Sequence, residues 1–261
     1  FHVTGVQTCA LPISDYNLKI IYDAAHAFGV KHHGQSVLLH GDLSVLSFHA
    51  TKVFNTFEGG AIISPDAKTK QHIDHLKNFG FVNETTVVAT GINGKMSEFN
   101  AALGVLQLDH VGKAIARRKA IDARYRALLD GTPGIRLLPI GEDIEENHAY
   151  FPILVEDGYP MARDALYEAL KTEGIHARRY FFPLISDFPM YRGLPSAHAS
   201  NLPVAKDASA RVICLPMYPS LEDQDLDRIV GVIRKPTLFS TSMANGWIAT
   251  PREVNLQQMH H

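Results

Sequence analysis

The sequence predicts an α/β fold with a larger N-terminal part and a smaller C-terminal part. Short apolar segments alternate with loops over residues 15–108, as expected for the strands of a βαβ-type sheet. Helical stretches follow, and Gly131, Pro133 and Gly134 then interrupt the chain. Beyond this interruption, strand-like and helical segments alternate again. The division between the two parts is therefore expected near residue 130.

Local patterns place the elements of the N-terminal part. The predicted strands cover Lys19–Tyr22, residues 45–48 and residues 61–63. Apolar periodicity then predicts helices, which are expected near Asp66–Lys77, over Ser97–Leu108 and over Val111–Leu129.

The C-terminal part begins with a predicted strand at His148–Val155. A helix at Met161–Glu173 follows, with Gly174 as its C-cap. Ala210–Leu215 is the next predicted strand. Leu221–Arg234 is expected to be the last amphipathic helix, because its acidic residues lie in the first half, as the helix dipole prefers.

Composition and charge exclude several classes of protein. The chain has 25 basic and 27 acidic residues and a net charge of −2, which indicates neither a nucleic-acid partner nor a membrane surface. Its hydrophobic content of 46% is sufficient for a sizeable core, yet no apolar run is long enough to span a bilayer. Cys9 and Cys214 are the only cysteines, so no disulfide framework is expected and a reducing cytoplasm is favoured.

The segment Ser47–Lys52 ends an apolar strand and carries a lysine into a small polar loop. Gly59 and Gly60 precede the next apolar run. Between two buried strands, desolvation lowers the pKa of a lysine ammonium toward the neutral amine. A neutral amine is what a Schiff base with an aldehyde cofactor requires. The alternative is a solvated loop lysine, which is the more common role.

Asp23 follows the predicted strand Lys19–Tyr22, at the carboxyl end, where open α/β sheets bind their ligands. A buried carboxylate there needs a cation, and a protonated pyridine nitrogen is one such cation. A protonated pyridine ring is the electron sink of pyridoxal phosphate (PLP) chemistry. The alternative role for Asp23 is that of a helix N-cap.

Three sequence blocks now point to one family. YDAAHAFG at 22–29, SFHATKVFNTFEGG at 47–60 and GINGKMSEFNAALG at 91–104 resemble the signature blocks of the DegT/DnrJ/EryC1/StrS sugar aminotransferases, in order and in spacing. The resemblance extends from Lys19 to Arg234, and the first two blocks are most similar to the branch that makes dTDP-4-amino-4,6-dideoxyglucose. It implies the aspartate-aminotransferase-like PLP-dependent transferase fold (type I), lacking its N-terminal part and with a small C-terminal α/β domain.

The resemblance also assigns residues to a PLP site. Lys52 matches the lysine that forms the Schiff base and shuttles the proton, and Asp23 matches the carboxylate on the pyridine nitrogen. His26 corresponds to a cofactor-contacting position and Ser47 to a phosphate ligand. Asn93 matches an asparagine that one subunit contributes to the cofactor phosphate in the active site of its partner. This implies a homodimer with shared active sites. Without the family, His26 could equally be a core histidine, and Ser47 and Asn93 could satisfy turn backbone groups.

The segment Arg178–Leu184 resembles the family segment that closes over the sugar nucleotide. Tyr180 is therefore a candidate sugar contact, and Arg178 could bind a diphosphate or a donor carboxylate bidentately. The alternative is that this aromatic run serves core or interface packing.

The implied reaction moves an amino group from an amino acid, most simply glutamate, to a nucleotide-linked keto sugar. The expected acceptor is dTDP-4-keto-6-deoxyglucose, in cell-surface or secondary-metabolite sugar synthesis. A 3-keto sugar is an alternative acceptor. The sister 3-dehydratases have a histidine where this chain has Lys52, which argues against that activity.

The ends of the chain match nothing in the family. Residues 1–14 are interpreted as a non-native leader, residues 15–130 as a partial PLP-binding domain, residues 131–235 as the small domain and residues 236–261 as a tail of unknown role. Relatives carry a segment before the block at Lys19 that supplies a phosphate-binding turn and a ring stacked on the cofactor. The alternative to an active aminotransferase is therefore that this chain is a catalytically inactive remnant.

Overall fold

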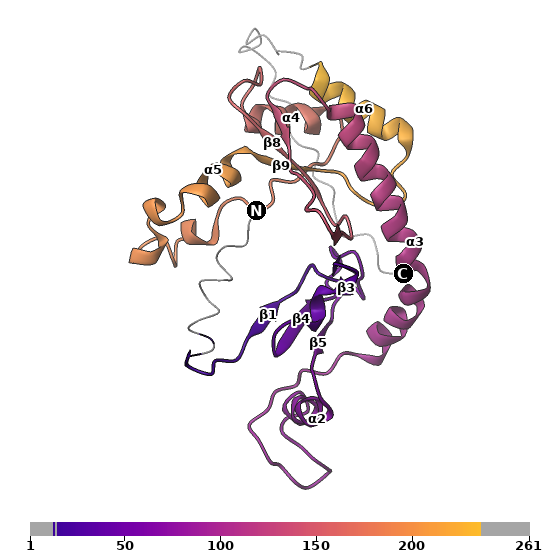
Figure 1. The fold of residues 1–261 in the computed structure, drawn as a ribbon, viewed down its shortest axis with the longest axis vertical. Helices are drawn as coiled ribbons and strands as arrows, with labels where there is room; N and C mark the ends of the chain where they lie inside the picture. The colour runs from indigo at the N-terminus through magenta and orange to yellow at the C-terminus, as the bar shows by residue number, and fades with distance from the viewer. Residues whose placement is uncertain (1–12, 14, 236–261) are drawn as a thin grey trace, which may run out of the picture.

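The computed structural model describes residue 13 and residues 15–235. The expected leader, apart from residue 13, and the expected tail lie outside the described residues, as does Cys9. Figure 1 shows a C-terminal unit at the top, a small sheet below it, and α2 (Ala67–Leu76) farthest from that unit. The long helix α3 (Glu98–Leu129) runs along one side and connects the two ends.

The N-terminal sheet has three strands in the order β1-β4-β5, which are β1 (Ile21–Asp23), β4 (Leu43–Ser47) and β5 (Gly60–Ile63). β1 is parallel to β4, whereas β5 is antiparallel to it. The carboxyl ends of parallel strands lie at the same edge of a sheet. Asp23 and Ser47 are the last residues of β1 and β4, so both lie at that edge.

β1 is an edge strand, and this corrects one prediction. Lys19–Tyr22 is expected to be buried, but the strand begins at Ile21 and its residues Ile21 and Tyr22 are 63% and 39% exposed. The prediction of burial is wrong because only β4 pairs with β1, so one side of the strand is open. Asp23 is exposed and Lys52 half-buried, which makes the site more open than the sequence predicts.

A second small sheet connects the two parts of the chain. It has the order β3-β2-β7 and consists of β2 (Lys31–His32), β3 (Gln35–Ser36) and β7 (Ile144–Glu145), with all pairs antiparallel. β7 comes from the segment after α3, so this sheet ties residues before and after the long helix together. Short 3-10 helices cover Val37–Leu39, Ile185–Asp187, Pro195–Ala197 and Ala199–Asn201.

The helix near Asp66–Lys77 is confirmed as α2, with the Asp66 side chain accepting a hydrogen bond from the N–H of Thr69 as its N-cap. The two helical stretches predicted over 97–108 and 111–129 form the single helix α3, so that prediction is wrong. No proline lies in this stretch, and the residues between the two predicted stretches, Asp109 and His110, are compatible with a helix.

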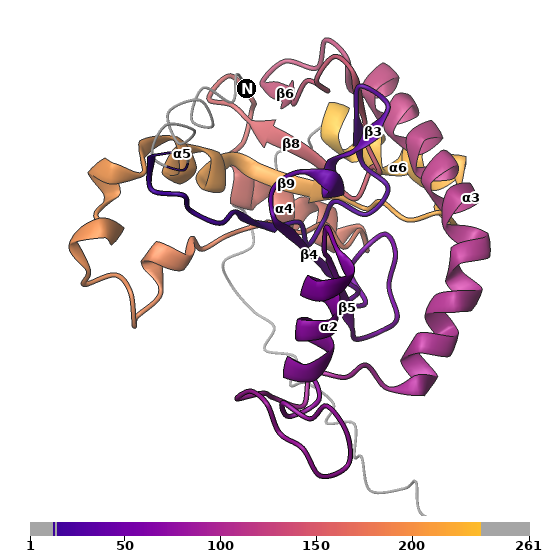
Figure 2. The same cartoon turned by 60° about the horizontal axis from the view of Figure 1, so that its bottom comes forward.

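The C-terminal unit is an antiparallel sheet covered by helices (Figure 2). Its strands, in the order β6-β8-β9, are β6 (Ile135–Leu137), β8 (Phe151–Val155) and β9 (Val212–Leu215). Its helices are α4 (Arg163–Thr172), α5 (Pro203–Arg211) and α6 (Asp223–Arg234). The predicted elements are present here with shifted bounds; Ala210, for example, belongs to α5 and not to β9. Gly174 follows α4 at a φ of 73°, as a C-cap glycine does.

A large hydrophobic core holds this unit together. Strand β8 contributes Phe151 and Ile153, β9 contributes Ile213, and the relative exposure of these side chains is 1% or less. The second half of α3 adds Ile121, Tyr125 and Leu129 to the same core. α3 therefore serves both the N-terminal part and the C-terminal unit.

In the described part of the chain, no helix has the length and apolar character that crossing a membrane requires.

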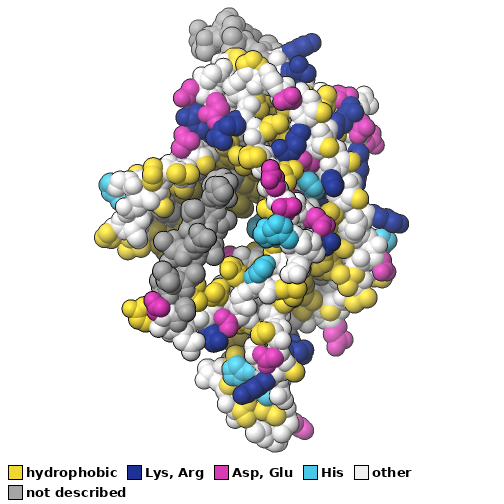
Figure 3. All heavy atoms as spheres, viewed as in Figure 1, with side chains coloured by type: hydrophobic (Ala, Val, Ile, Leu, Met, Phe, Trp, Pro, Cys, Tyr) yellow, Lys and Arg dark blue, Asp and Glu magenta, His cyan; other side chains and the backbone are white. Residues whose placement is uncertain are grey.

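The first half of α3 carries large apolar side chains in solvent, with Phe99 77%, Val105 67%, Leu106 63% and Leu108 55% exposed. Figure 3 shows hydrophobic side chains gathered at the lower right, where Figure 1 places this half of the helix.

Candidate active site

Lys52 and His26 meet at the carboxyl edge of the β1–β4 pair. Nζ of Lys52 lies 2.9 Å from Nε2 of His26, within hydrogen-bond distance. Partial burial of the ring lowers the pKa of His26 below 6.5, the positive charge of Lys52 lowers it further, and the charge of Asp23 opposes both effects. The lowered pKa favours the neutral imidazole, in which an unprotonated Nε2 accepts a hydrogen bond from Nζ of Lys52.

Asp23 and Ser47 complete the group at the same edge. Oδ1 of Asp23 accepts a hydrogen bond from the N–H of Ala25 at 3.1 Å, and Oδ2 has no hydrogen bond within the part of the chain that the structure describes. Oγ of Ser47 accepts from the N–H of His49 at 3.3 Å, which leaves its own hydrogen free to be donated. Two strand ends thus bring a carboxylate, a hydroxyl, an imidazole and an amine to one edge.

Three phenylalanine rings support the loop that carries Lys52. Phe28 and Phe54 stack with ring centroids 4.3 Å apart and an interplanar angle of 7°. Phe48 meets Phe54 edge-on at 4.8 Å and Phe28 at 6.3 Å. Because Phe28 follows His26 and the other two rings flank Lys52, this cluster fixes the two loops against each other.

Two further residues at this site carry no recognisable signal in the sequence. Asn147 is buried and donates hydrogen bonds to the carbonyl oxygens of His26 and Phe28 at 2.8 and 2.9 Å. The centroid of the Tyr150 ring lies 5.5 Å from that of the His26 ring, and burial raises the pKa of the Tyr150 hydroxyl. Both residues come from the segment before β8, more than a hundred positions from His26. Only the three-dimensional fold could reveal them.

The structure connects Tyr180 to this group through aromatic contacts. Its ring meets Tyr150 edge-on at 5.5 Å, and Tyr150 in turn contacts His26. A cavity of about 210 Å³ lies beside the Lys52 loop, with Thr51, Tyr150, Arg178 and Tyr180 in its lining. Arg178 is exposed, and its backbone pairs with Cys214 in β9. Both predicted substrate residues therefore line a cavity next to Lys52.

Asn93 lies apart from the other candidates. It is exposed and forms a β-bridge with Asn78, in the loop between α2 and α3. Among the described residues, no hydrogen bond or ion pair joins it to the group around Lys52. Figure 1 places this loop at the end of the molecule farthest from the C-terminal unit.

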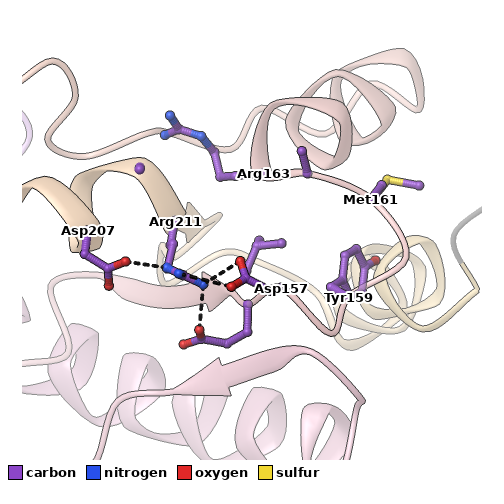
Figure 4. A pocket seen from close by; sticks show the side chains of 10 residues that line it. Asp157, Tyr159, Met161, Arg163, Asp207 and Arg211 are labelled. Atoms are coloured by element: carbon purple, nitrogen blue, oxygen red, sulfur yellow. Dashed lines mark hydrogen bonds and ion pairs between the residues drawn. The ribbon is translucent and has the colours of Figure 1, made fainter.

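A second cavity, of about 450 Å³, contains none of the predicted site residues (Figure 4). Arg211 lies in its wall and pairs with Asp207 at 2.7 Å, Glu156 at 2.9 Å and Asp157 at 3.1 Å. The Arg211 guanidinium is already paired with three carboxylates, so its positive charge is not available to bind an anionic ligand.

Comparison with known proteins defines the class. The profile of the DegT/DnrJ/EryC1/StrS aminotransferase family matches residues 8–234, and the chain belongs to this family. The resemblance of the three sequence blocks is thereby confirmed.

Within the family, the chain is 52% identical over 222 residues to the dTDP-4-amino-4,6-dideoxy-D-glucose transaminase of Escherichia coli. The match covers 84% of this chain and 59% of that protein. The chain thus spans about three fifths of the length of this relative.

Solved structures confirm the type I fold of PLP-dependent transferases. DesI, crystallised in the presence of its TDP-sugar product, superposes with a TM-score of 0.77 at 35% identity, over 86% of this chain and 57% of that one. The PLP form of a Streptococcus pneumoniae protein, assigned as a sugar aminotransferase, superposes with a TM-score of 0.76 at 26% identity. The superposition covers 85% of this chain and 58% of that one.

The residues at the β1–β4 edge fit PLP. The cofactor presents an aldehyde, a basic ring nitrogen and a phosphate. At this edge, the Lys52 amine matches the aldehyde, the Asp23 carboxylate matches the ring nitrogen, and the Ser47 hydroxyl is one donor to the phosphate. Each chemical group of the cofactor has a matching side chain here.

Proposed function

We propose that this protein is a PLP-dependent aminotransferase that transfers the amino group of L-glutamate to dTDP-4-keto-6-deoxyglucose. The observation that carries the proposal is the meeting of Lys52, His26 and Asp23 at the carboxyl edge of two parallel strands. The 52% identity to the E. coli transaminase supports the choice of sugar. Both the activity and the substrates are proposals, because the chain spans three fifths of that relative.

Each side chain has a defined task in this proposal. When bound, PLP supplies a protonated ring that withdraws electrons from the reacting carbon. Nζ of Lys52 would hold the aldehyde carbon until the amine of the amino donor takes its place on that carbon, and the lysine amine so released would accept the proton from Cα of the donor. The charge of Asp23 keeps the proton on the ring nitrogen. Nε2 of His26 orients the lysine amine, and the Ser47 hydroxyl donates to the phosphate.

Arg178 and Tyr180 are proposed as substrate contacts. They line the cavity beside Lys52, and Arg178 is exposed enough to meet an anion. A guanidinium binds a diphosphate or a carboxylate through two parallel hydrogen bonds. The Tyr180 ring offers a flat apolar surface with a hydroxyl at its edge, which suits a deoxysugar.

The test is product analysis. The purified chain with PLP, L-glutamate and dTDP-4-keto-6-deoxyglucose is expected to yield an amino sugar whose nitrogen is on C4 by NMR, and Lys52→Ala is expected to yield none. Amination of a 3-keto isomer in place of the 4-keto sugar would contradict the proposed acceptor sugar. It would still agree with the proposed sugar aminotransferase activity. A chain that binds PLP yet aminates neither sugar would contradict the proposed activity.

We propose in addition that two copies form a dimer and share their active sites. The support is the exposed position of Asn93, in a loop whose neighbours Phe79, Val82 and Ile92 are 48%, 47% and 71% exposed. Alone, Lys52→Ala is expected to be inactive and Asn93→Ala to be weakly active. Mixing them is expected to restore part of the activity, since hybrid dimers contain one unaltered site. A monomer in sedimentation, or no restoration on mixing, would contradict this proposal.

A further inference from the structure

We infer that Asn147 is a positioning residue, which fixes the turn that presents the His26 ring to the amine of Lys52. This inference rests on the proposed function, because it concerns the same cofactor site. The Asn147 side chain bonds neither to the His26 ring nor to the Lys52 amine. It acts on the position of the ring through the backbone carbonyls of the turn.

The Asn147 side chain is 5% exposed and its amide group is fully used. Nδ2 donates to the carbonyl oxygens of His26 and Phe28, and Oδ1 accepts from the N–H of Ala149 at 3.1 Å. An amide has two N–H donors and a carbonyl acceptor, and here every N–H has a partner. Buried amides with satisfied hydrogen bonds hold one orientation, because any rotation leaves polar groups unpaired.

The two carbonyls that Asn147 binds flank Ala27, in the turn that follows β1. The turn is closed by a hydrogen bond from the N–H of Ala27 to the carbonyl of Ala24 at 2.9 Å. Phe28 is anchored on its other side by the stack with Phe54. With both carbonyls held, the backbone of the turn is fixed in the position from which Nε2 of His26 lies 2.9 Å from Nζ of Lys52.

The segment that carries Asn147 is itself held in place. Nη1 of Arg118, from α3, donates to the carbonyls of His148 and Ala149 at 3.3 Å and to that of Met217 at 2.8 Å. Tyr150, on the same segment, packs its ring against His26. The C-terminal unit thereby contributes a backbone clamp and a ring contact to a histidine of the N-terminal sheet.

The residue type matters for this role. Aspartate has the same shape but, when ionised, cannot donate to the two carbonyls, and serine is too short to reach both. Alanine removes every contact. The clamp therefore requires the amide of asparagine at this position.

The experiment uses the cofactor-free chain and imidazole NMR, with the His26 signal assigned by its loss in His26→Gln. In the wild-type chain the pKa of His26 is expected below 6.5, and at pH above 8 its Nε2 is expected to be unprotonated because Lys52 donates to it. The groups facing the ring are Lys52, Asp23 and Tyr150. In Asn147→Ala the pKa of His26 is expected to rise toward 6.5 and the tautomers to mix.

Tyr159→Phe is the matched control. It removes another buried hydrogen bond of the C-terminal unit, from the Tyr159 hydroxyl to the carbonyl of Ile233 at 2.7 Å, away from His26. It is expected to leave the His26 signal unchanged. Where Asn147→Ala does not fold, Asn147→Ser serves in its place and is expected to shift His26 in the same direction.

An unchanged pKa and tautomer of His26 in a folded Asn147 variant would overturn the inference. So would an equal shift in Tyr159→Phe, because a general loss of packing would then be the cause. PLP titration of the wild-type chain is a separate measurement. Its failure would contradict the proposed function and leave the His26 result standing.

Discussion

Nζ of Lys52 lies 2.9 Å from Nε2 of His26, although the two residues are 26 positions apart in the chain. The contact joins the loop after β4 to the turn after β1. It depends on the parallel pairing of these strands, which brings both carboxyl ends to one edge.

The lowered pKa of His26, caused first by burial of the ring and then by this contact with Lys52, makes stability depend on pH in a defined direction. The folded state lowers the pKa of His26, so on acidification below about 6.5 the unfolded state takes up the proton first. The free energy of unfolding therefore falls as the pH drops through this window and is independent of His26 above it. Urea unfolding at about pH 7.5 and about pH 5.5 is expected to show a smaller loss in His26→Gln than in the wild type. Equal losses would contradict the lowered pKa.

The phenylalanine cluster is expected to stabilise the Lys52 loop. Phe54 is 5% exposed and contacts both Phe28 and Phe48, so Phe54→Ala is expected to lower the free energy of unfolding by about 3 kcal/mol. Phe99→Ala is the control, because Phe99 is 77% exposed. The same truncation there is expected to change the free energy of unfolding by less than about 0.5 kcal/mol. Urea unfolding of both variants measures the difference, and similar costs would contradict a packed cluster.

Cys214 is expected to be unreactive in the folded chain. Burial raises the pKa of its thiol to about 11, so little thiolate exists at pH 8. In a Cys9→Ser variant, which leaves Cys214 as the single thiol, Ellman's reagent is expected to react slowly in buffer and rapidly in urea. Fast reaction in buffer would show that β9 opens more readily than its packing in the C-terminal core implies.

Arg178 and Tyr180 are expected to affect the sugar nucleotide more than the amino donor. The loss of one charge-assisted hydrogen bond costs about 1.5–3 kcal/mol, which corresponds to a fall of about 10- to 100-fold in kcat/KM. Arg178→Ala is therefore expected to raise the KM for the sugar nucleotide with little change for glutamate. Arg192→Ala, an exposed arginine outside the cavity lining, is the control. An effect on the glutamate KM alone would instead assign Arg178 to the donor carboxylate.

The sequence predicts much of this fold because its signals are local. The helix near Asp66–Lys77, the strands that end within one residue of Asp23 and Ser47, and Gly174 as the C-cap of α4 all follow from residue types within a few positions. The single helix α3 differs from the two helices that the sequence predicts, because apolar periodicity alone does not show whether two adjacent helical stretches join.

The supporting side chains of the site could not be predicted in the same way. Asn147 and Tyr150 act on His26 from more than a hundred positions away, and nothing in their own neighbourhood marks them. The exposure of β1 is likewise not predictable, because an apolar run does not reveal whether its strand lies at the edge or the centre of a sheet.

Mapping the site of PLP attachment tests the central claim most directly. The chain is incubated with PLP, reduced with borohydride and digested, and the labelled peptides are identified by mass spectrometry. The account predicts label on Lys52 at low PLP concentration, with little on exposed lysines such as Lys19, and loss of that label in Lys52→Ala. Label spread evenly over the surface lysines, with no preference for Lys52, would contradict a PLP site at the β1–β4 edge.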